Sequence, residues 1–281
     1  MNSRDVIRHP GLEAKSRIAS ARGEVTRRSV HLKAGQILMD AVAQVMDDAK
    51  CDSGVIVLDG IDVGPFDYVM PSYSNDGIHA AWYSETHSCK AARLDHATAI
   101  VGRRADAWWL HCHTRWQSDR GVGMGHLLPD TVVISTDAVV TLYAFEGGSF
   151  DVGFDPETAF PLFHVQGEGR SYGNALIAKV CPHEDLYTSV QALISEAGFS
   201  QATVFGIGSL IGASFEDGTP MQCPISEILI APNAQWDGSL ELPIHCVDTD
   251  FNLFYGNVVS GQAPVLVTFE LMIIETAGNP L

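Results

Sequence analysis

Two segments of the chain repeat one pattern of apolar and polar positions. In each, four apolar residues recur at spacings of four, three and one, which places them on one face of a helix. They are Leu38, Val42, Val45 and Met46 in the first segment and, 148 positions later, Leu186, Val190, Leu193 and Ile194 in the second. A short apolar run ending at a glycine follows each (GVIVLDG at 54–60, ATVFGIG at 202–208). Each segment therefore predicts a helix, a short loop and a strand.

The two segments match again further along the chain. WLHCHTRW at 109–116 is similar to PIHCVDTD at 243–250, and GHLLP at 125–129 is similar to GNVVS at 256–260. A β-rich run follows in both cases. The sequence therefore predicts an α+β protein with two tandem domains, each a sheet packed on one main helix.

We divide the chain accordingly into four parts. A basic N-terminal arm covers residues 1–27, and the first domain covers 28–165. A linker rich in glycine and polar residues covers 166–173, and the second domain covers 174–281.

Charge argues against nucleic acid as a partner. The 281 residues include 17 basic and 34 acidic side chains, a net charge of −17. Residues 1–28 carry a net +4, while residues 29–281 carry −21. Such an acidic body repels phosphate, which makes DNA an unfavourable partner. We interpret the basic segment as a solvated arm that packs on the acidic body; the alternative is a nucleic-acid-binding arm.

The sequence also predicts where the protein works. It has no run of about 18 apolar residues that would span a membrane, and its N-terminus lacks the apolar core of a signal peptide. Its six cysteines are scattered without a CxxC pair, as expected for reduced thiols. We therefore expect a cytoplasmic protein with no membrane partner.

Residues 108–116 (WWLHCHTRW) have the aromatic and apolar content of a strand. Alternate side chains of a strand share a face. His111, His113 and Arg115 then point one way, and Cys112 points into the core. Two histidines two residues apart on a strand can bring both imidazoles to one metal ion.

A third histidine would complete such a site. His126 follows a glycine-rich turn (GVGMG, 121–125) that can return the chain beside the strand. Together with His111 and His113 it would form the ligand set of a catalytic zinc site with an open fourth position. Zinc, or another divalent transition metal, would activate water or polarise a carbonyl. The alternative is a group of hydrogen-bonded histidines without a metal.

The second repeat keeps only part of this trio. His245 matches His111, but Val247 stands where the second histidine would be and Asn257 where the third would be. We therefore expect the metal in the first domain alone.

Several charged residues are candidates for chemistry around the metal. Arg115 either holds a substrate carboxylate or forms an ion pair, and we assign ion pairs to Arg103 and Arg104. Glu157 and Asp119 are candidate acid–base groups.

At these residues the chain resembles the plants-and-prokaryotes-conserved (PPC) domain, which accompanies AT-hooks in plants. The resemblance rests on the HCH strand, the GH turn and LISEAGFSQATVFGIGSLIGASFEDG at 193–218. It covers residues 28–275 as a tandem pair. It implies a mainly antiparallel sheet with one main helix in each domain, assembly into trimers, and a metal on the three histidines. Members are often labelled DNA-binding, but this chain has no Arg-Gly-Arg-Pro core of an AT-hook.

Two functions remain open at this point. The first is a small-molecule metalloenzyme of the hydrolase or lyase type. The alternative is a non-enzymatic regulator that binds DNA or a partner protein. A weaker third possibility is a metabolite sensor without turnover.

Overall fold

The computed structural model describes residues 7–167 and 169–276, which form a largely antiparallel sheet structure with two helices. We call strands β1–β13 with helix α1 the N-terminal half. Its elements are β1 (Ile18–Leu32), α1 (Leu38–Ala49), β2 (Ser53–Val57), β3 (Asp62–Val63), β4 (Phe66–Val69), β5 (Pro71–Ser72), β6 (Trp82–Tyr83), β7 (His87–Cys89), β8 (Ala92–Arg104), β9 (Ala107–Ser118), β10 (Gly121–Leu127), β11 (Ala138–Glu146), β12 (Ser149–Phe154) and β13 (Pro161–Gln166).

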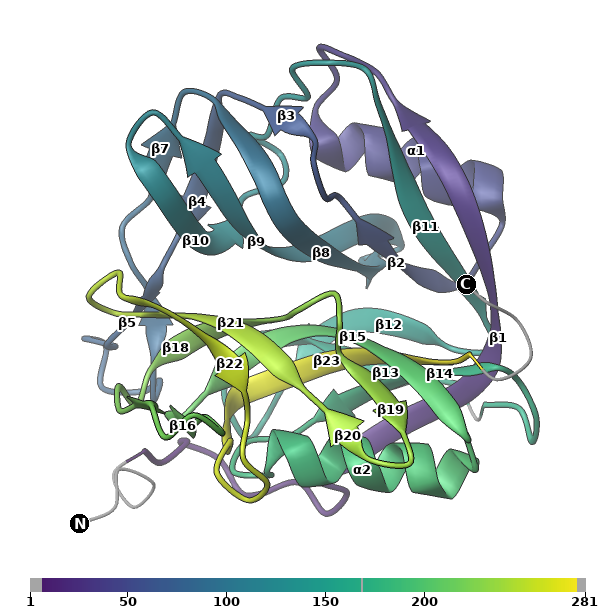
Figure 1. Cartoon of the computed structure of the whole chain (residues 1–281), viewed down its shortest axis with the longest axis vertical. Helices are drawn as coiled ribbons and strands as arrows, with labels where there is room; N and C mark the ends of the chain where they lie inside the picture. Colours follow the sequence, from purple (N-terminus) through teal and green to yellow (C-terminus); the bar gives the residue numbers. More distant parts are fainter. Residues whose placement is uncertain (1–6, 168, 277–281) are drawn as a thin grey trace.

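The remaining elements form the C-terminal half. They are β14 (Ala175–Val180), α2 (Leu186–Ala197), β15 (Gln201–Leu210), β16 (Ala213–Ser214), β17 (Pro220–Met221), β18 (Ser226–Ile230), β19 (Gln235–Asp237), β20 (Leu240–Glu241), β21 (Pro243–Asp248), β22 (Leu253–Asn257) and β23 (Val265–Glu275). Figure 1 shows most of the N-terminal half above the C-terminal half, with β12 and β13 lying in the lower part, and with α1 and α2 at opposite ends of the molecule.

The two halves pair their main strands in the same order. In the N-terminal half the order of neighbours is β1, β11, β2, β8, β9 and β10. In the C-terminal half it is β14, β23, β15, β18, β21 and β22. All of these pairings are antiparallel.

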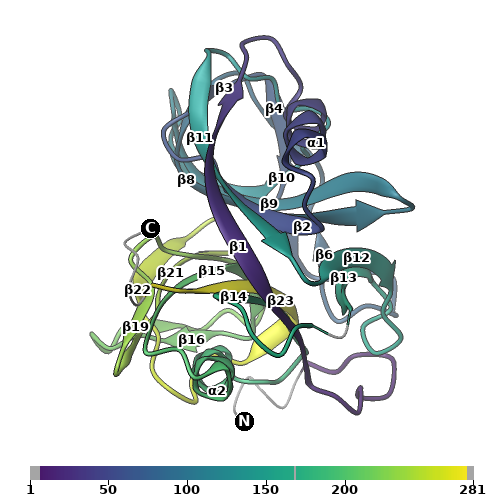
Figure 2. The same cartoon turned by 90° about the vertical axis from the view of Figure 1, so that its right-hand side faces the viewer.

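Strand β1 belongs to both halves. Its residues 24–32 pair with β11, and its residues 18–23 pair with β14. Figure 2 shows β1 running the length of the molecule along both halves. Residues 18–27, which we expected in an arm, are therefore part of the sheet, and the expected boundary between 27 and 28 falls inside this strand.

Buried apolar side chains gather in three main clusters. One surrounds the buried face of α1 and includes Leu38, Val42 and Met46. Another surrounds α2 and includes Leu186 and Val190. A third cluster contains side chains from both halves and lies between them. Burying both faces of the central strands in this way fixes the halves against each other.

The helix faces agree with the sequence pattern. Within α1 the buried residues include three of the four predicted positions, and Val45 is partly buried. Within α2 all four predicted residues are buried. Each described helix has 12 residues, and neither is long and apolar enough to cross a membrane.

Candidate metal centre

Strands β9 and β10 bring the three histidines together. The strands form an antiparallel hairpin in which His126 lies directly opposite His113. Alternation along β9 puts His111 on the same face as His113, while Leu110 and Cys112 are fully buried in the core on the other face. Ligand atoms of the three imidazoles lie within 4.8 Å of one another. The convergence predicted from the HCH strand and the GH turn is therefore present.

Hydrogen bonds to the C-terminal half orient two of the three rings. Nδ1 of His111 donates to Oε2 of Glu270 on β23 at 3.1 Å. Nδ1 of His113 donates to the carbonyl of Ile228 on β18 at 2.8 Å. A neutral imidazole carries one N–H, so these bonds leave the Nε2 of each ring with a lone pair.

The two Nε2 atoms lie 3.0 Å apart. Two lone pairs at this distance repel each other unless a proton or a cation lies between them. Burial lowers the pKa of His113 well below its ordinary value, and His111 lowers it further. Burial also lowers the pKa of His126, followed by the effects of His111 and His113. A metal cation that accepts both lone pairs fits the arrangement.

His126 also indicates a metal cation at this place. Its Nδ1 is buried and has no hydrogen-bond partner among the described residues. Its ring lies against those of His111 and His113, with centroids 4.8 and 5.4 Å away, and against Tyr83 at 5.2 Å. Buried polar atoms are rarely left without a partner, so the residues present fit a bound metal ion.

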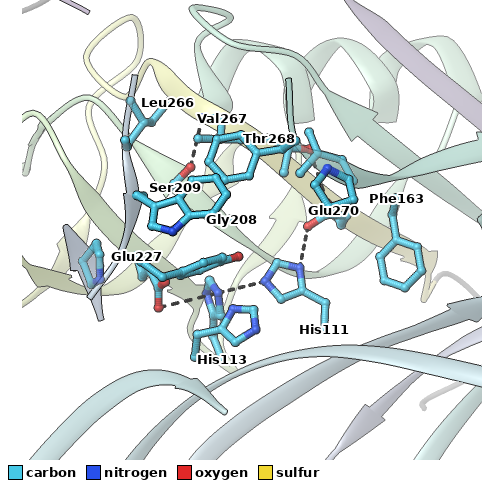
Figure 3. A pocket seen from close by; sticks show the side chains of 18 of the residues that line it. His111, His113, Phe163, Gly208, Ser209, Glu227, Leu266, Val267, Thr268 and Glu270 are labelled. Carbon is cyan, nitrogen blue, oxygen red and sulfur yellow. Dashed lines mark hydrogen bonds and ion pairs between the residues drawn. The ribbon is translucent and has the colours of Figure 1, made fainter. Parts of the chain in front are cut away.

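The histidines line a cavity of about 350 Å³ between the two halves. Figure 3 shows His111 and His113 facing Glu270 and Glu227 across this space. Its walls include aromatic and aliphatic side chains, namely Trp82, Tyr83, Trp109, Val152, Phe160, Leu162, Phe163 and Leu266. A few polar groups in a mostly apolar cavity are typical of a small-molecule site.

Two glutamates of this site were not singled out in the sequence. Oε2 of Glu227 on β18 is buried, lies 3.8 Å from Nε2 of His113, and has no hydrogen-bond partner within the described part of the chain. Burial raises the pKa of Glu227 well above its ordinary value. Oε1 of Glu270 accepts from Thr268 at 3.3 Å. The available signal was an acid inside an apolar strand, as in SEILI (226–230).

The predicted catalytic residues lie elsewhere. Arg115 forms an ion pair with Asp95, which is the alternative that we had left open. Glu157 is buried against Arg17, with 2.6 Å between its Oε2 and the guanidinium Nη1. Asp119 is exposed in the turn between β9 and β10. None of these three candidates lines the histidine cavity.

Arg104, to which we had assigned an ion pair, does line the cavity. Its guanidinium lies over the ring of Trp109, 4.8 Å from the centroid. No ion pair of Arg104 is found among residues 7–167 and 169–276. Arg104, Glu227 and Glu270 are the lining residues with charged side chains besides the histidines.

The second hairpin, β21–β22, has a different residue at the third position from the one that we expected. Val247 is paired with Leu253, as His113 is paired with His126. Asn257, which we had matched to His126, is paired with Pro243 instead. The sequence match GHLLP/GNVVS was wrong by four residues because the connection between the two strands differs in length.

Comparisons with known proteins give matches to solved structures only. No family model and no curated protein matches the chain. A metal-containing protein from Archaeoglobus fulgidus is 16% identical, with a TM-score of 0.41, over 51% of this chain and 97% of that one. A plant- and prokaryote-conserved (PPC) protein from Pyrococcus horikoshii is 13% identical, with a TM-score of 0.37, over 54% of this chain and 97% of that one.

A further similar structure is that of a protein from Ralstonia eutropha, which is described provisionally as DNA-binding. It is 14% identical, with a TM-score of 0.39, over 51% of this chain and 96% of that one. The neighbours thus include a PPC protein, the family that the sequence resembles, and each covers about half of this chain. Their descriptions concern those proteins and say nothing of what this chain binds.

Proposed function

We propose that the protein is a metal-dependent small-molecule enzyme whose ion is held by His111, His113 and His126. One observation carries the proposal: the Nε2 atoms of His111 and His113 lie 3.0 Å apart, with both Nδ1 atoms already bonded. The adjoining cavity gives a small molecule access to the ligand cluster.

Some residues of the site orient the histidine rings, and others face the small molecule. Glu270 and the carbonyl of Ile228 fix the histidine rings, and such partners of ligands strengthen metal binding. The apolar walls exclude water, and Arg104 offers a cation to an anionic ligand. A bound zinc ion would supply Lewis-acid chemistry for a hydrolytic or lyase-type reaction.

We also propose that the chain consists of two tandem PPC-like units, each with its sheet packed on one helix. The sequence repeat at an offset of 148 supports this, as do the matching orders of strand pairing. In this interpretation the metal belongs to the histidines of the first unit, while the second unit closes the cavity.

Metal analysis of protein purified without a His-tag tests the proposal. We expect about one transition-metal ion per chain and none in a His111→Ala/His113→Ala variant. His31→Ala, an exposed histidine on β1, is the matched control and should keep the metal. Hydrolysis of small esters by the loaded protein, absent in the double variant, then tests the enzymatic part. Wild-type protein that stays metal-free after reconstitution would refute the proposal.

A further inference from the structure

We propose that Glu227 is a fourth metal ligand, so that the centre is completed by a side chain of the C-terminal half. This inference rests on the proposed metal centre and adds a residue that the three-histidine cluster does not include.

Glu227 stands out first by its position. All five residues of β18, Ser-Glu-Ile-Leu-Ile, are buried. Oε2 of Glu227 is buried and has no hydrogen-bond partner within residues 7–167 and 169–276. Buried carboxylates are expensive unless they are paired or coordinate a metal. A carboxyl group placed in this way is stabilised by a proton or by a cation nearby.

The side chain of Glu227 points toward the histidines that would hold the metal ion. Oε2 of Glu227 is 3.8 Å from Nε2 of His113, the nitrogen that is free for a metal. The same strand fixes both groups, because the carbonyl of Ile228 holds the other nitrogen of His113. Figure 3 shows Glu227 directed at His113 from the opposite wall of the cavity.

Charge balance points to the same conclusion. A divalent ion among three neutral imidazoles would carry its full charge into a buried site. Glu227 and Glu270 are the two carboxylates that line this cavity, together with the cation of Arg104, so the charged lining carries −1 to set against an ion of +2. Glu270 bonds to His111, which makes it a positioning residue, whereas Glu227 is free to bind the ion itself.

A set of three imidazoles and one carboxylate also bears on the reaction. Imidazole and carboxylate ligands together suit several divalent transition metals. An ion that takes five or six ligands would keep open positions toward the cavity, where a small molecule could bind.

Cobalt binding to the full chain tests the role of Glu227 with two readouts. The variants are Glu227→Gln, which keeps the shape of the side chain, and Glu270→Gln as the matched cavity carboxylate. In chelator competition we expect Glu227→Gln to weaken Co²⁺ binding more than about 100-fold, beyond the 10–100-fold typical of a residue that only orients a ligand. Glu270→Gln should stay within that lower range.

The second readout is the visible absorption of bound Co²⁺, which reports its ligand set. Glu227→Gln should change the band shape, whereas Glu270→Gln should preserve it.

The outcomes separate the two proposals. Wild-type protein that binds Co²⁺, together with a Glu227→Gln variant of equal affinity and spectrum, overturns the role of Glu227 and leaves the three-histidine centre in place. Wild-type protein that binds no metal overturns both proposals.

Discussion

Hairpins β9–β10 and β21–β22 occupy equivalent places in the pairing order of the two halves, yet only the first gathers three imidazoles. The second keeps His245, but hydrophobic Val247 and Leu253 occupy the positions of His113 and His126. Val247 is buried in the apolar cluster between the halves. A shared backbone frame therefore does not determine a site; the side chains that face the other half do.

The largest expected effect comes from a substitution that places a residue of the second hairpin in the first. His113→Val introduces the residue of the second hairpin and should abolish metal binding, because one of the three histidine ligands is lost. His245→Val is the matched control and should leave the metal content at its wild-type value. Elemental analysis of both variants measures this, and equal metal content in the two would contradict the assignment of the site to the first hairpin.

A second comparison concerns the cores of the two halves. Leu38 and Leu186 are fully buried at equivalent positions of α1 and α2. Each Leu→Ala substitution should lower the free energy of unfolding by about 2–5 kcal/mol, measured by urea denaturation. Leu12→Ala, at a side chain that is 92% exposed, should change it by less than about 0.5 kcal/mol. A negligible effect at either helix would show that its half does not depend on that core.

The smallest expected effect concerns His245, which corresponds to His111 but lacks the other two histidines of the trio beside it. Burial lowers its pKa to about 4, with further lowering by His96 and Arg115, while Asp59 and Asp95 oppose the shift. Between pH 6.5 and 4 the unfolded chain binds a proton at this residue that the folded chain does not bind. The free energy of unfolding should therefore fall as the pH is lowered through this window.

Substitution of His245 by Gln isolates this contribution. Above pH 6.5, the free energy of unfolding of the metal-free wild type and of His245→Gln should change with pH in the same way. Below pH 6.5, the free energy of unfolding of the wild type should fall more steeply. The slopes should differ by less than about 1.4 kcal/mol per pH unit, the value for one full proton. Urea unfolding at a series of pH values measures the difference, and parallel profiles would argue against a buried neutral His245.

Local periodicity explains what the sequence could predict. The helix faces follow from residues three and four apart, and the core face of β9, with Leu110, Cys112 and Trp116, follows from strict alternation. His126 could be added because only a short turn separates it from His113. These relations span fewer than twenty residues, so the packing of the rest of the chain does not alter them.

The other wall of the site could not be predicted in this way. Glu227 and Glu270 lie more than 100 positions from the histidines of β9. Glu227 reaches His113, and Glu270 reaches His111, only when β18 and β23 pack against β9. We selected Glu157 for its residue type alone, and in the structure it forms an ion pair with Arg17. No pattern along the chain encodes which strand faces which across the two halves.

Strand β1 has a consequence for the exposed edges of the sheet. Its residues 18–23 occupy an edge of the C-terminal half, although β1 continues into the N-terminal half. A chain that began at residue 28, the expected domain boundary, would leave the backbone groups of β14 along this edge unpaired. Unpaired strand edges promote aggregation, so residues 18–23 protect the C-terminal half against contact with other molecules through this edge.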